Sequence, residues 1–502
     1  MKLDLKKKSV SSGAIAIFTK TFTYIIQMLG TIILARLLTP EDFGLVAMIM
    51  SIIGIIFIFK DLGLTDATIQ KDQINHSQIS TLFWINIFFC IFVLIFLLAI
   101  APIIGYFFKE PKLKLLTIAL STSFFFIGLS TQHLALLKRN LMFRQIMYIE
   151  ILSTLFSISL AIVFAILGFK YWALVIRLIS LSIFTALFAW FFCKWRPGKF
   201  ALKSDIKSML IFGTNINIYF LINYFARNLD KTLIGWRFGA ANLGLYQKAH
   251  SLFGLPVNQL TLSLQGVAVT TFSKIKDDPH KFRRYYFRAL SVLSFVGMPL
   301  CALMVVMSKD IIYLLLGPQW EKATNIFSIL GLASLVQIID STKGWIHVSI
   351  GRPDRWLKWG IFSSISIVVS IIIGLPFGPL GVATTFTIIT YILTMPAICY
   401  AGKPVGITFS MVISIIWKYF ISASIPGILI WYIFYYRTVF ENLIPRLTLT
   451  FVFYLSGYLL FIYLFFNGLE PLFNFISYIK HINFFPKHFL SRIISRPYSE
   501  SA

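Results

Sequence analysis

Acidic residues are scarce in this sequence, and charged residues of either sign are few. Only 19 of the 502 residues are Asp or Glu, against 45 Lys and Arg, and charged residues make up 13% of the chain. A soluble protein of this length needs many more polar and charged residues to cover its surface. The composition therefore excludes an ordinary soluble domain.

The sequence also lacks the motifs of common enzymes and metal sites. Its four cysteines, Cys90, Cys193, Cys301 and Cys399, show none of the close spacing that metal sites and disulfide frameworks use. There is no Asp-x-Asp pair, no His-Glu-x-x-His, no Walker-type glycine loop and no Gly-x-Ser-x-Gly elbow. Loops long enough for a catalytic domain are missing as well. We therefore expect a protein that is not an enzyme and carries no cofactor or metal.

Long apolar runs make up most of the chain. Hydrophobic residues account for 58% of it and aromatic residues for 17%, and the mean hydropathy is +0.82. The runs are too long and too continuous for the strands of a membrane barrel, and many reach the length of about 20 residues with which a helix crosses a bilayer. We predict an all-α membrane protein with about 14 transmembrane helices. The expected spans are 13–35, 43–60, 81–105, 115–137, 146–167, 171–193, 209–235, 241–272, 289–315, 323–350, 357–376, 379–401, 411–436 and 447–467.

The basic residues lie mainly in every second loop between these spans. Examples are the lysines of the N-terminus, the loop 194–207 and the loop 274–288. By the positive-inside rule this pattern places both termini in the cytoplasm, with the chain crossing the membrane many times. We interpret the net charge of +26 as contact with anionic membrane lipids rather than with nucleic acid, because the basic residues are not clustered on a folded polar face.

Two parts of the chain resemble each other at an offset of 200 residues. The segment "ARLLTPEDFGL", 35–45, aligns with "WRFGAANLGL", 236–245, so that Gly44 corresponds to Gly244 and Gly54 to Gly254. An even number of spans per copy gives both copies the same orientation, and two such lobes are typical of alternating-access transporters. We predict an N-lobe at 1–200, a pseudo-symmetric C-lobe of six helices at 201–405, two further spans at 406–467 and an amphipathic cytoplasmic tail at 468–502.

The first of these repeated segments has the residues of a helix start. Thr39 suits an N-cap, Pro40 the first helical position, and Glu41 with Asp42 the positive end of the helix. Gly44 would allow a second helix to approach closely. We interpret the segment as architectural, and a direct substrate role for Glu41 or Asp42 is the alternative.

Charged side chains within the predicted spans are the candidate functional residues. Each is costly in lipid unless it is hydrated or paired. Bases outnumber the three acids, Glu150, Asp230 and Asp340, which favours a hydrated, basic central cavity. The alternative is that Arg227 pairs with Asp230 and Lys343 with Asp340. The predicted substrate-binding residues are Lys20, Gln27, Arg177, Asn223, Arg227, Lys248 and Lys343, and Asp230 and Asp340 are predicted to couple transport to H⁺ or Na⁺.

The motifs "ARLLTPEDFGLVAMI", "FKDLGLTDATIQK" (59–71) and "LDKTLIGWRFGAANLGLYQKAHSLFGLP" (229–256) resemble a known family. They are similar to the polysaccharide-exporter branch of the multidrug/oligosaccharidyl-lipid/polysaccharide superfamily, of the colanic and teichuronic acid type, over about the first 400 residues. The resemblance implies a flippase that moves undecaprenyl-diphosphate-linked oligosaccharide from the inner to the outer leaflet. A polysaccharide polymerase and glycosyltransferases would then be partners.

Two other functions fit the same fold. One is export of multidrug type, for which an acidic cavity would be expected, and the other is flipping of the peptidoglycan lipid precursor. The excess of bases in the spans favours an anionic substrate over organic cations.

Overall fold

The computed structural model describes residues 2–58, 63–71, 74–200, 207–436 and 442–481. All regular elements in these ranges are helices, and no strand occurs in them. In the first half of the chain they are α1 (Lys2–Leu37), α2 (Pro40–Ile58), α3 (Leu64–Gln70), α4 (His76–Phe107), α5 (Lys112–Arg139), α6 (Phe143–Ile166), α7 (Tyr171–Phe192) and α8 (Lys207–Lys274). In the second half they are α9 (Pro279–Val306), α10 (Ser308–Leu315), η1 (Pro318–Trp320), α11 (Ala323–Asp340), α12 (Thr342–Ser349), α13 (Pro353–Gly374), η2 (Leu375–Phe377), α14 (Gly378–Gly402), η3 (Lys403–Val405), α15 (Phe409–Trp431), η4 (Tyr432–Tyr436), α16 (Leu443–Phe466) and α17 (Glu470–His481).

The all-helical membrane fold expected from the sequence is confirmed. Twelve helical stretches of the described chain are long and apolar enough to cross a membrane. Two of them, of 47 and 53 residues, are each long enough for two crossings. The number of crossings therefore agrees with the expected fourteen.

α8 is bent at Gly239, inside the repeated segment. Its backbone there has φ 80° and ψ 178°, a conformation that only glycine adopts without strain. The helix consequently consists of two limbs, 207–238 and 240–274. This break falls where the sequence predicted a loop between two spans.

The chain forms two compact units. Unit 1 comprises residues 1–252, 311–327 and 360–389, and unit 2 comprises 253–310, 328–359 and 390–502. The predicted lobe boundaries at 200 and 405 stay predictions. Each unit is described below by itself.

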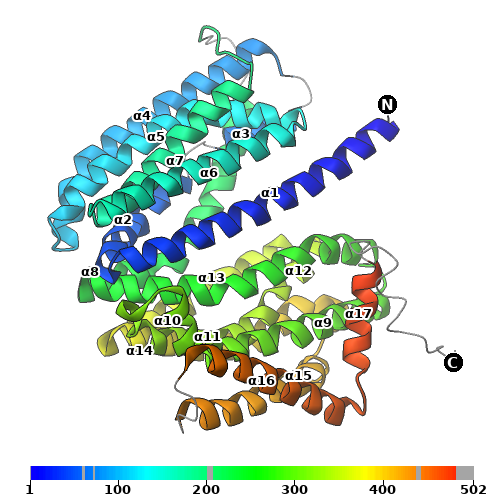
Figure 1. The fold of residues 1–502 in the computed structure, drawn as a ribbon. Helices are drawn as coiled ribbons and strands as arrows, with labels where there is room; N and C mark the ends of the chain where they lie inside the picture. The colour runs from blue at the N-terminus through cyan, green and yellow to red at the C-terminus, as the bar shows by residue number, and fades with distance from the viewer. Residues whose placement is uncertain (1, 59–62, 72–73, 201–206, 437–441, 482–502) are drawn as a thin grey trace. The chain divides into compact units, whose positions relative to one another are not determined.

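Unit 1 contains a layer in which α4, α5, α6 and α7 pack side by side, as Figure 1 shows in blue to green. α1 lies along α6, and Gly30 permits the approach, because a Cβ there would be 2.5 Å from Ile158. The short helix α3 is held by Arg139, whose guanidinium donates to the carbonyl oxygens of Thr68 and Lys71 at 2.6 and 2.5 Å. A cation at the end of a helix also complements the helix dipole.

Unit 2 is built around α9, which packs against α15, α16 and α17. Its core is apolar and includes the buried side chains of Met298, Ile338 and Tyr458. The carboxylate of Asp310, 1% exposed, accepts hydrogen bonds from Arg446 at 2.5 and 3.1 Å and from the Tyr435 hydroxyl at 2.6 Å. This buried ion pair joins the start of α16 to the first turn of α10, which follows α9.

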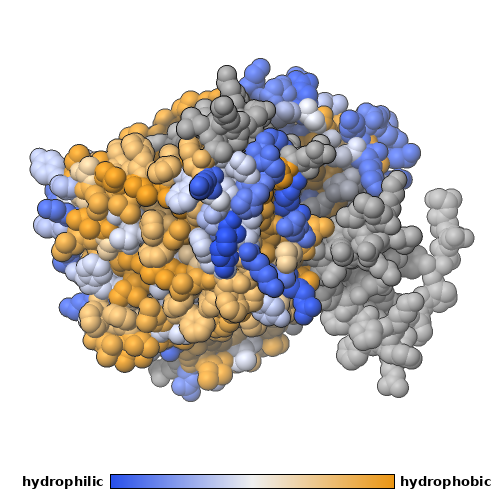
Figure 2. Space-filling view, turned by 90° about the horizontal axis from the view of Figure 1, so that it is seen from above, coloured by the Kyte–Doolittle hydropathy of each residue, from blue (hydrophilic) through white to orange (hydrophobic). Residues whose placement is uncertain are grey.

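Large apolar side chains are exposed along the outer faces of many helices. On α4, for example, Phe88, Phe92 and Ile95 are 59%, 63% and 59% exposed. Figure 2 shows broad hydrophobic areas between separate groups of hydrophilic residues. Such a surface is stable in lipid rather than in water.

The segment that begins α2 forms the helix cap that its sequence predicts. Pro40 is the first helical residue. The Thr39 hydroxyl accepts from the Asp42 amide at 3.3 Å, and the Asp42 carboxylate accepts from the Thr39 amide at 2.9 Å. This reciprocal capping box satisfies backbone donors at the helix start. Asp42 is therefore used in the fold, whereas Glu41 is exposed and forms an ion pair with Lys112 at 3.3 Å.

The two copies of the repeated segment contact each other reciprocally within unit 1. A Cβ on Gly44 would lie 1.7 Å from the carbonyl oxygen of Ala240, and one on Gly244 would lie 1.8 Å from that of Pro40. Both pairs of equivalent residues are 200 positions apart, so the contact has the form of a two-fold interface. The α-hydrogens of both glycines point at a carbonyl oxygen, an arrangement worth about 0.5–1 kcal/mol each. This geometry agrees with two pseudo-symmetric copies in the same orientation.

We predict that Thr39→Ala destabilises the protein by about 1 kcal/mol, because the amide of Asp42 loses its side-chain acceptor. Thermal unfolding of the purified protein in detergent measures the effect. Thr39→Ser keeps the hydroxyl and should unfold like the native chain. Equal melting temperatures for the alanine and serine variants would show that the cap contributes nothing.

Candidate functional site

Lys248 is a buried cation that forms no ion pair with the described residues. Its side chain belongs to α8 in unit 1, and the residue is only 9% exposed. Within the described part of the chain it forms no ion pair, and its Nζ lies over the ring of Phe43, 3.8 Å from the ring centre. The charge of Arg177, from α7, acts on it electrostatically, and Arg177 has no ion pair among the described residues either. Two predicted substrate-binding residues are thus brought together by the fold.

The aromatic ring replaces only part of the hydration that Lys248 loses. A cation–π contact contributes about 2 kcal/mol when it is desolvated. The effective cost of moving an ion out of water is several kcal/mol, and Arg177 adds repulsion. A group that bound both cations and carried two negative charges would remove this repulsion. The arrangement is therefore suited to bind an anion such as a phosphate.

A carboxylate lies on the same helix, but it is satisfied by other partners. Asp230, 6% exposed, accepts from the Tyr246 hydroxyl at 2.8 Å and from the Lys231 amide at 2.8 Å. Lys231 in turn donates to the Asn228 side chain at 2.8 Å. His250 interacts electrostatically with both Asp230 and Lys231. The carboxylate of Asp230 is therefore occupied by Tyr246 and the Lys231 amide and forms no ion pair with Lys248.

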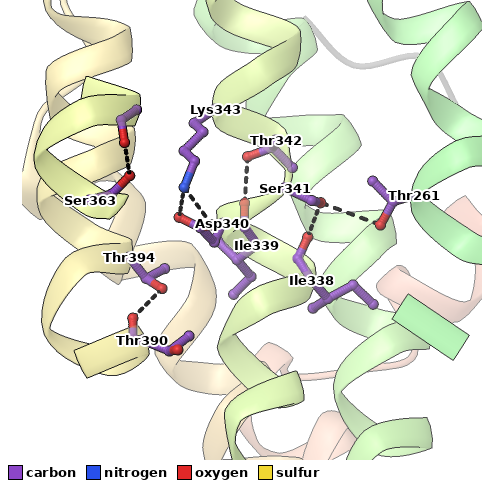
Figure 3. A network of polar contacts seen from close by, with 11 residues as sticks. Thr261, Ile338, Ile339, Asp340, Ser341, Thr342, Lys343, Ser363, Thr390 and Thr394 are labelled. Carbon is purple, nitrogen blue, oxygen red and sulfur yellow. Dashed lines mark hydrogen bonds and ion pairs between the residues drawn. The ribbon is translucent and has the colours of Figure 1, made fainter. Parts of the chain in front are cut away.

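The second cluster lies in unit 2, where α11 ends and α12 begins. Figure 3 shows Lys343 pointing to Asp340, with Nζ–O distances of 2.5 and 2.7 Å. The two side chains are 21% and 25% exposed. Beside them the Ser341 hydroxyl donates to Thr261 at 3.3 Å and to the carbonyl of Ile338 at 2.7 Å. The pairing of Lys343 with Asp340, one of the two alternatives raised by the sequence, is the one that the structure contains.

The remaining predicted residues lie on α1 and on the first limb of α8. Lys20 is exposed, Gln27 is half-buried, and the charge of Lys20 acts on Glu150 of α6, although the two form no ion pair. The side chains of Asn223 and Arg227 lie outside the described residues. The predicted pairing of Arg227 with Asp230 therefore stays a prediction.

Phe43 and Tyr246 belong to the unit 1 cluster, and sequence reasoning missed them. An aromatic residue among many others in apolar runs carries no distinguishing signal. The repeat could have pointed to Phe43, which precedes Gly44, and to Tyr246, which follows Gly244 by two positions.

The model of one protein family, described as polysaccharide biosynthesis protein, matches residues 33–325, which is more than half of the chain. The chain belongs to the polysaccharide biosynthesis protein family. The matched range includes Lys248, Arg177 and both copies of the repeated segment. This family agrees with the polysaccharide-exporter branch that the sequence resembles.

Two curated members of this group are similar over most of their length. The lipopolysaccharide biosynthesis protein WzxC of Escherichia coli is 26% identical over 441 residues, 86% of this chain and 88% of the relative. The teichuronic acid biosynthesis protein TuaB of Bacillus subtilis is 26% identical over 356 residues, 70% of this chain and 74% of the relative. This polysaccharide biosynthesis family member is thus similar to proteins of two different bacteria.

Solved structures show the same fold. The lipid II flippase MurJ in an inward closed conformation aligns with a TM-score of 0.72 at 17% identity, covering 90% of this chain and 99% of that one. An inward-facing multidrug resistance MATE transporter aligns with a TM-score of 0.62 at 14% identity, covering 76% and 94%. At these identities the likeness shows the fold, and substrate must be argued from the residues of the site.

We predict that Tyr246→Phe destabilises the protein by about 1–3 kcal/mol, because Asp230 loses a hydrogen-bond donor in a buried position. Thermal unfolding in detergent reports the loss. Tyr106→Phe removes the same hydroxyl from a side chain that is 87% exposed, and serves as the control. A Tyr246 variant as stable as this control would contradict the role given to the Tyr246–Asp230 bond.

Proposed function

We propose that this protein translocates undecaprenyl-diphosphate-linked oligosaccharide across the bacterial inner membrane by alternating access through a basic central cavity. The observation that carries the proposal is the pair of Lys248 and Arg177, buried or half-buried cations without an ion pair among the described residues. Membership of the polysaccharide biosynthesis protein family supports a saccharide-bearing substrate.

In this mechanism the two cations bind the diphosphate of the head group. Charge-assisted hydrogen bonds to phosphate oxygens are stronger than a cation–π contact, so Lys248 exchanges the ring of Phe43 for the anion. Lys20, Gln27, Asn223, Arg227 and Lys343 extend the polar path for the diphosphate and the glycan. The polyprenyl chain remains in lipid throughout. Both termini lie in the cytoplasm, where glycosyltransferases supply the substrate, and a polymerase uses it on the opposite side.

A transport assay tests the proposal. Purified protein in liposomes should move a fluorescent diphosphate-linked oligosaccharide between leaflets, and Lys248→Gln and Arg177→Gln should each lower the apparent affinity by about ten- to a hundredfold, since each removes a charged hydrogen-bond donor. Lys20→Ala and Arg227→Ala should lower transport as well. Lys418→Gln removes a lysine that lies over the Phe466 ring at 4.8 Å in unit 2 and should leave transport unchanged.

Two outcomes would contradict this function. Unimpaired transport by both glutamine variants at normal protein levels would exclude the cation pair from the substrate path. Export of an organic cation such as ethidium, without movement of the lipid-linked glycan, would establish the multidrug function instead.

A second candidate is flipping of the peptidoglycan precursor, favoured by the alignment with the lipid II flippase MurJ over 99% of that chain. Both substrates present the same lipid diphosphate, so Lys248 and Arg177 suit either. Competition in the liposome assay between lipid II and a lipid-linked exopolysaccharide repeat unit separates them. Preference for lipid II would replace the first candidate.

Asp230 and Asp340 are proposed as the carboxylates that couple transport to H⁺ or Na⁺. Asp340 is partly exposed and paired with Lys343, and Asp230 lies near Lys231 and His250, so each carboxylate has a charged neighbour whose place a coupling ion could take. We expect Asp340→Asn or Asp230→Asn to abolish the acceleration of flipping by an imposed H⁺ or Na⁺ gradient while substrate binding persists. Acceleration that is equal in the native and both asparagine proteins would refute this coupling.

A further inference from the structure

Lys248, the cation of the proposed anion site, lies one helical turn from the reciprocal contact of Gly44 and Gly244. Gly244 is four residues before Lys248 on α8, and Gly44 directly follows Phe43 on α2. Gly44 and Gly244 each face a carbonyl oxygen of the other helix. The cation–π contact of Lys248 with Phe43 therefore joins the same two helix starts as the reciprocal glycine contact.

Phe43 also links these helices to the end of α1. Its ring packs edge-on against Trp320, with 5.4 Å between ring centres. The Trp320 indole donates to the carbonyl of Ala35 at 2.8 Å, and the Gln319 amide donates to the same oxygen at 2.8 Å. A movement of Phe43 would therefore be transmitted to α1 as well as to α8.

We propose that binding of an anion by Lys248 opens the contact between Gly44 and Gly244, with Phe43 as the positioning residue that couples the two. This inference rests on the proposed function, since it takes Lys248 as a ligand of the diphosphate. With no anion bound, the ammonium group lies on the Phe43 ring and holds α2 against α8. When an anion binds, the ammonium group leaves the ring, and the helix starts lose the cation–π contact that joins them beside the two glycines.

The contact between Gly44 and Gly244 is suited to reversible opening. At Gly44 and Gly244 backbone meets backbone, and each glycine contributes only a weak α-hydrogen contact. Any larger residue would hold the helices apart, because an added Cβ would overlap a backbone carbonyl that cannot rotate away. The substitution Gly44→Ala should therefore mimic the open state without any ligand.

Distances between spin labels measure this opening directly. Glu41 and Ala241 are exposed and lie next to the two halves of the contact, one on α2 and one on α8. Both are replaced by labelled cysteine in a full-length protein whose four native cysteines are alanine, reconstituted in lipid nanodiscs. Inorganic pyrophosphate serves as the probe, and its binding is measured separately by calorimetry.

We expect pyrophosphate to increase the ratio of long to short label distances by roughly 5- to 150-fold, the usual range of coupling between sites. Gly44→Ala and Gly244→Ala should each produce the long distance without pyrophosphate. Lys248→Gln should abolish the response to pyrophosphate, yet Gly44→Ala added to it should still open the contact.

Phe43→Leu, which keeps an apolar side chain but removes the ring, should open the contact between Gly44 and Gly244 partly and weaken the response to pyrophosphate. Gly266→Ala, where an added Cβ meets nothing within 4 Å, should leave the short distance and the response intact.

The results separate this inference from the proposed function. Pyrophosphate that binds through Lys248 while the label distance stays constant would overturn the coupling and leave the anion site standing. Failure of pyrophosphate to bind the native protein would overturn the anion site and this inference with it. An unchanged short distance between the labels in both glycine variants would show that this contact does not hold α2 and α8 together.

Discussion

A charge on a helix that crosses lipid must be paired, hydrated or bound by a ligand, and this constraint explains most of the polar structure of the chain. Asp310 with Arg446 and Asp340 with Lys343 satisfy it by pairing. Asp230 satisfies it through a tyrosine hydroxyl and a backbone amide. Lys248 satisfies it only in part, with an aromatic ring, and the neighbouring charge of Arg177 makes its position less favourable still. Lys248 meets the constraint least well, and this is where we expect a ligand to bind.

The difference between the two polar clusters has a consequence for transport. The cluster of unit 2 is an ion pair and so carries no net charge, whereas the cations of unit 1 have no ion-pair partner among the described residues. A diphosphate would bind the second kind of cluster, and a proton or sodium ion could alter the first. The two clusters therefore differ in net charge, and only the cations of unit 1 are suited to bind an anion as they stand. Relatives of the same fold can then differ in substrate through a few side chains.

Duplication of the sequence gives the molecule a contact that a single copy could not make. Gly44 against Ala240 and Gly244 against Pro40 are the same contact made twice. The capping box of Thr39 and Asp42 fixes where α2 starts, and the positive φ of Gly239 fixes where the second limb of α8 starts. Because the positions of both helix starts are fixed, a small displacement of Phe43 or Lys248 changes the contact between Gly44 and Gly244.

The number of spans and the capping of α2 could be predicted from the sequence, because apolar length and local hydrogen bonding are properties of short segments. Not all limits could be: the expected span 289–315 is divided between α9 and α10, and α9 begins at Pro279. The repeated glycines were visible too, as was the identity of the charged residues. The pairing of Lys343 with Asp340, three residues apart, was one of the alternatives that the sequence raised. The tertiary structure decided that Asp230 accepts from Tyr246 and that Lys248 lies over Phe43 of a distant helix. Such contacts depend on distances between segments that are far apart in the chain, and local sequence does not contain these distances.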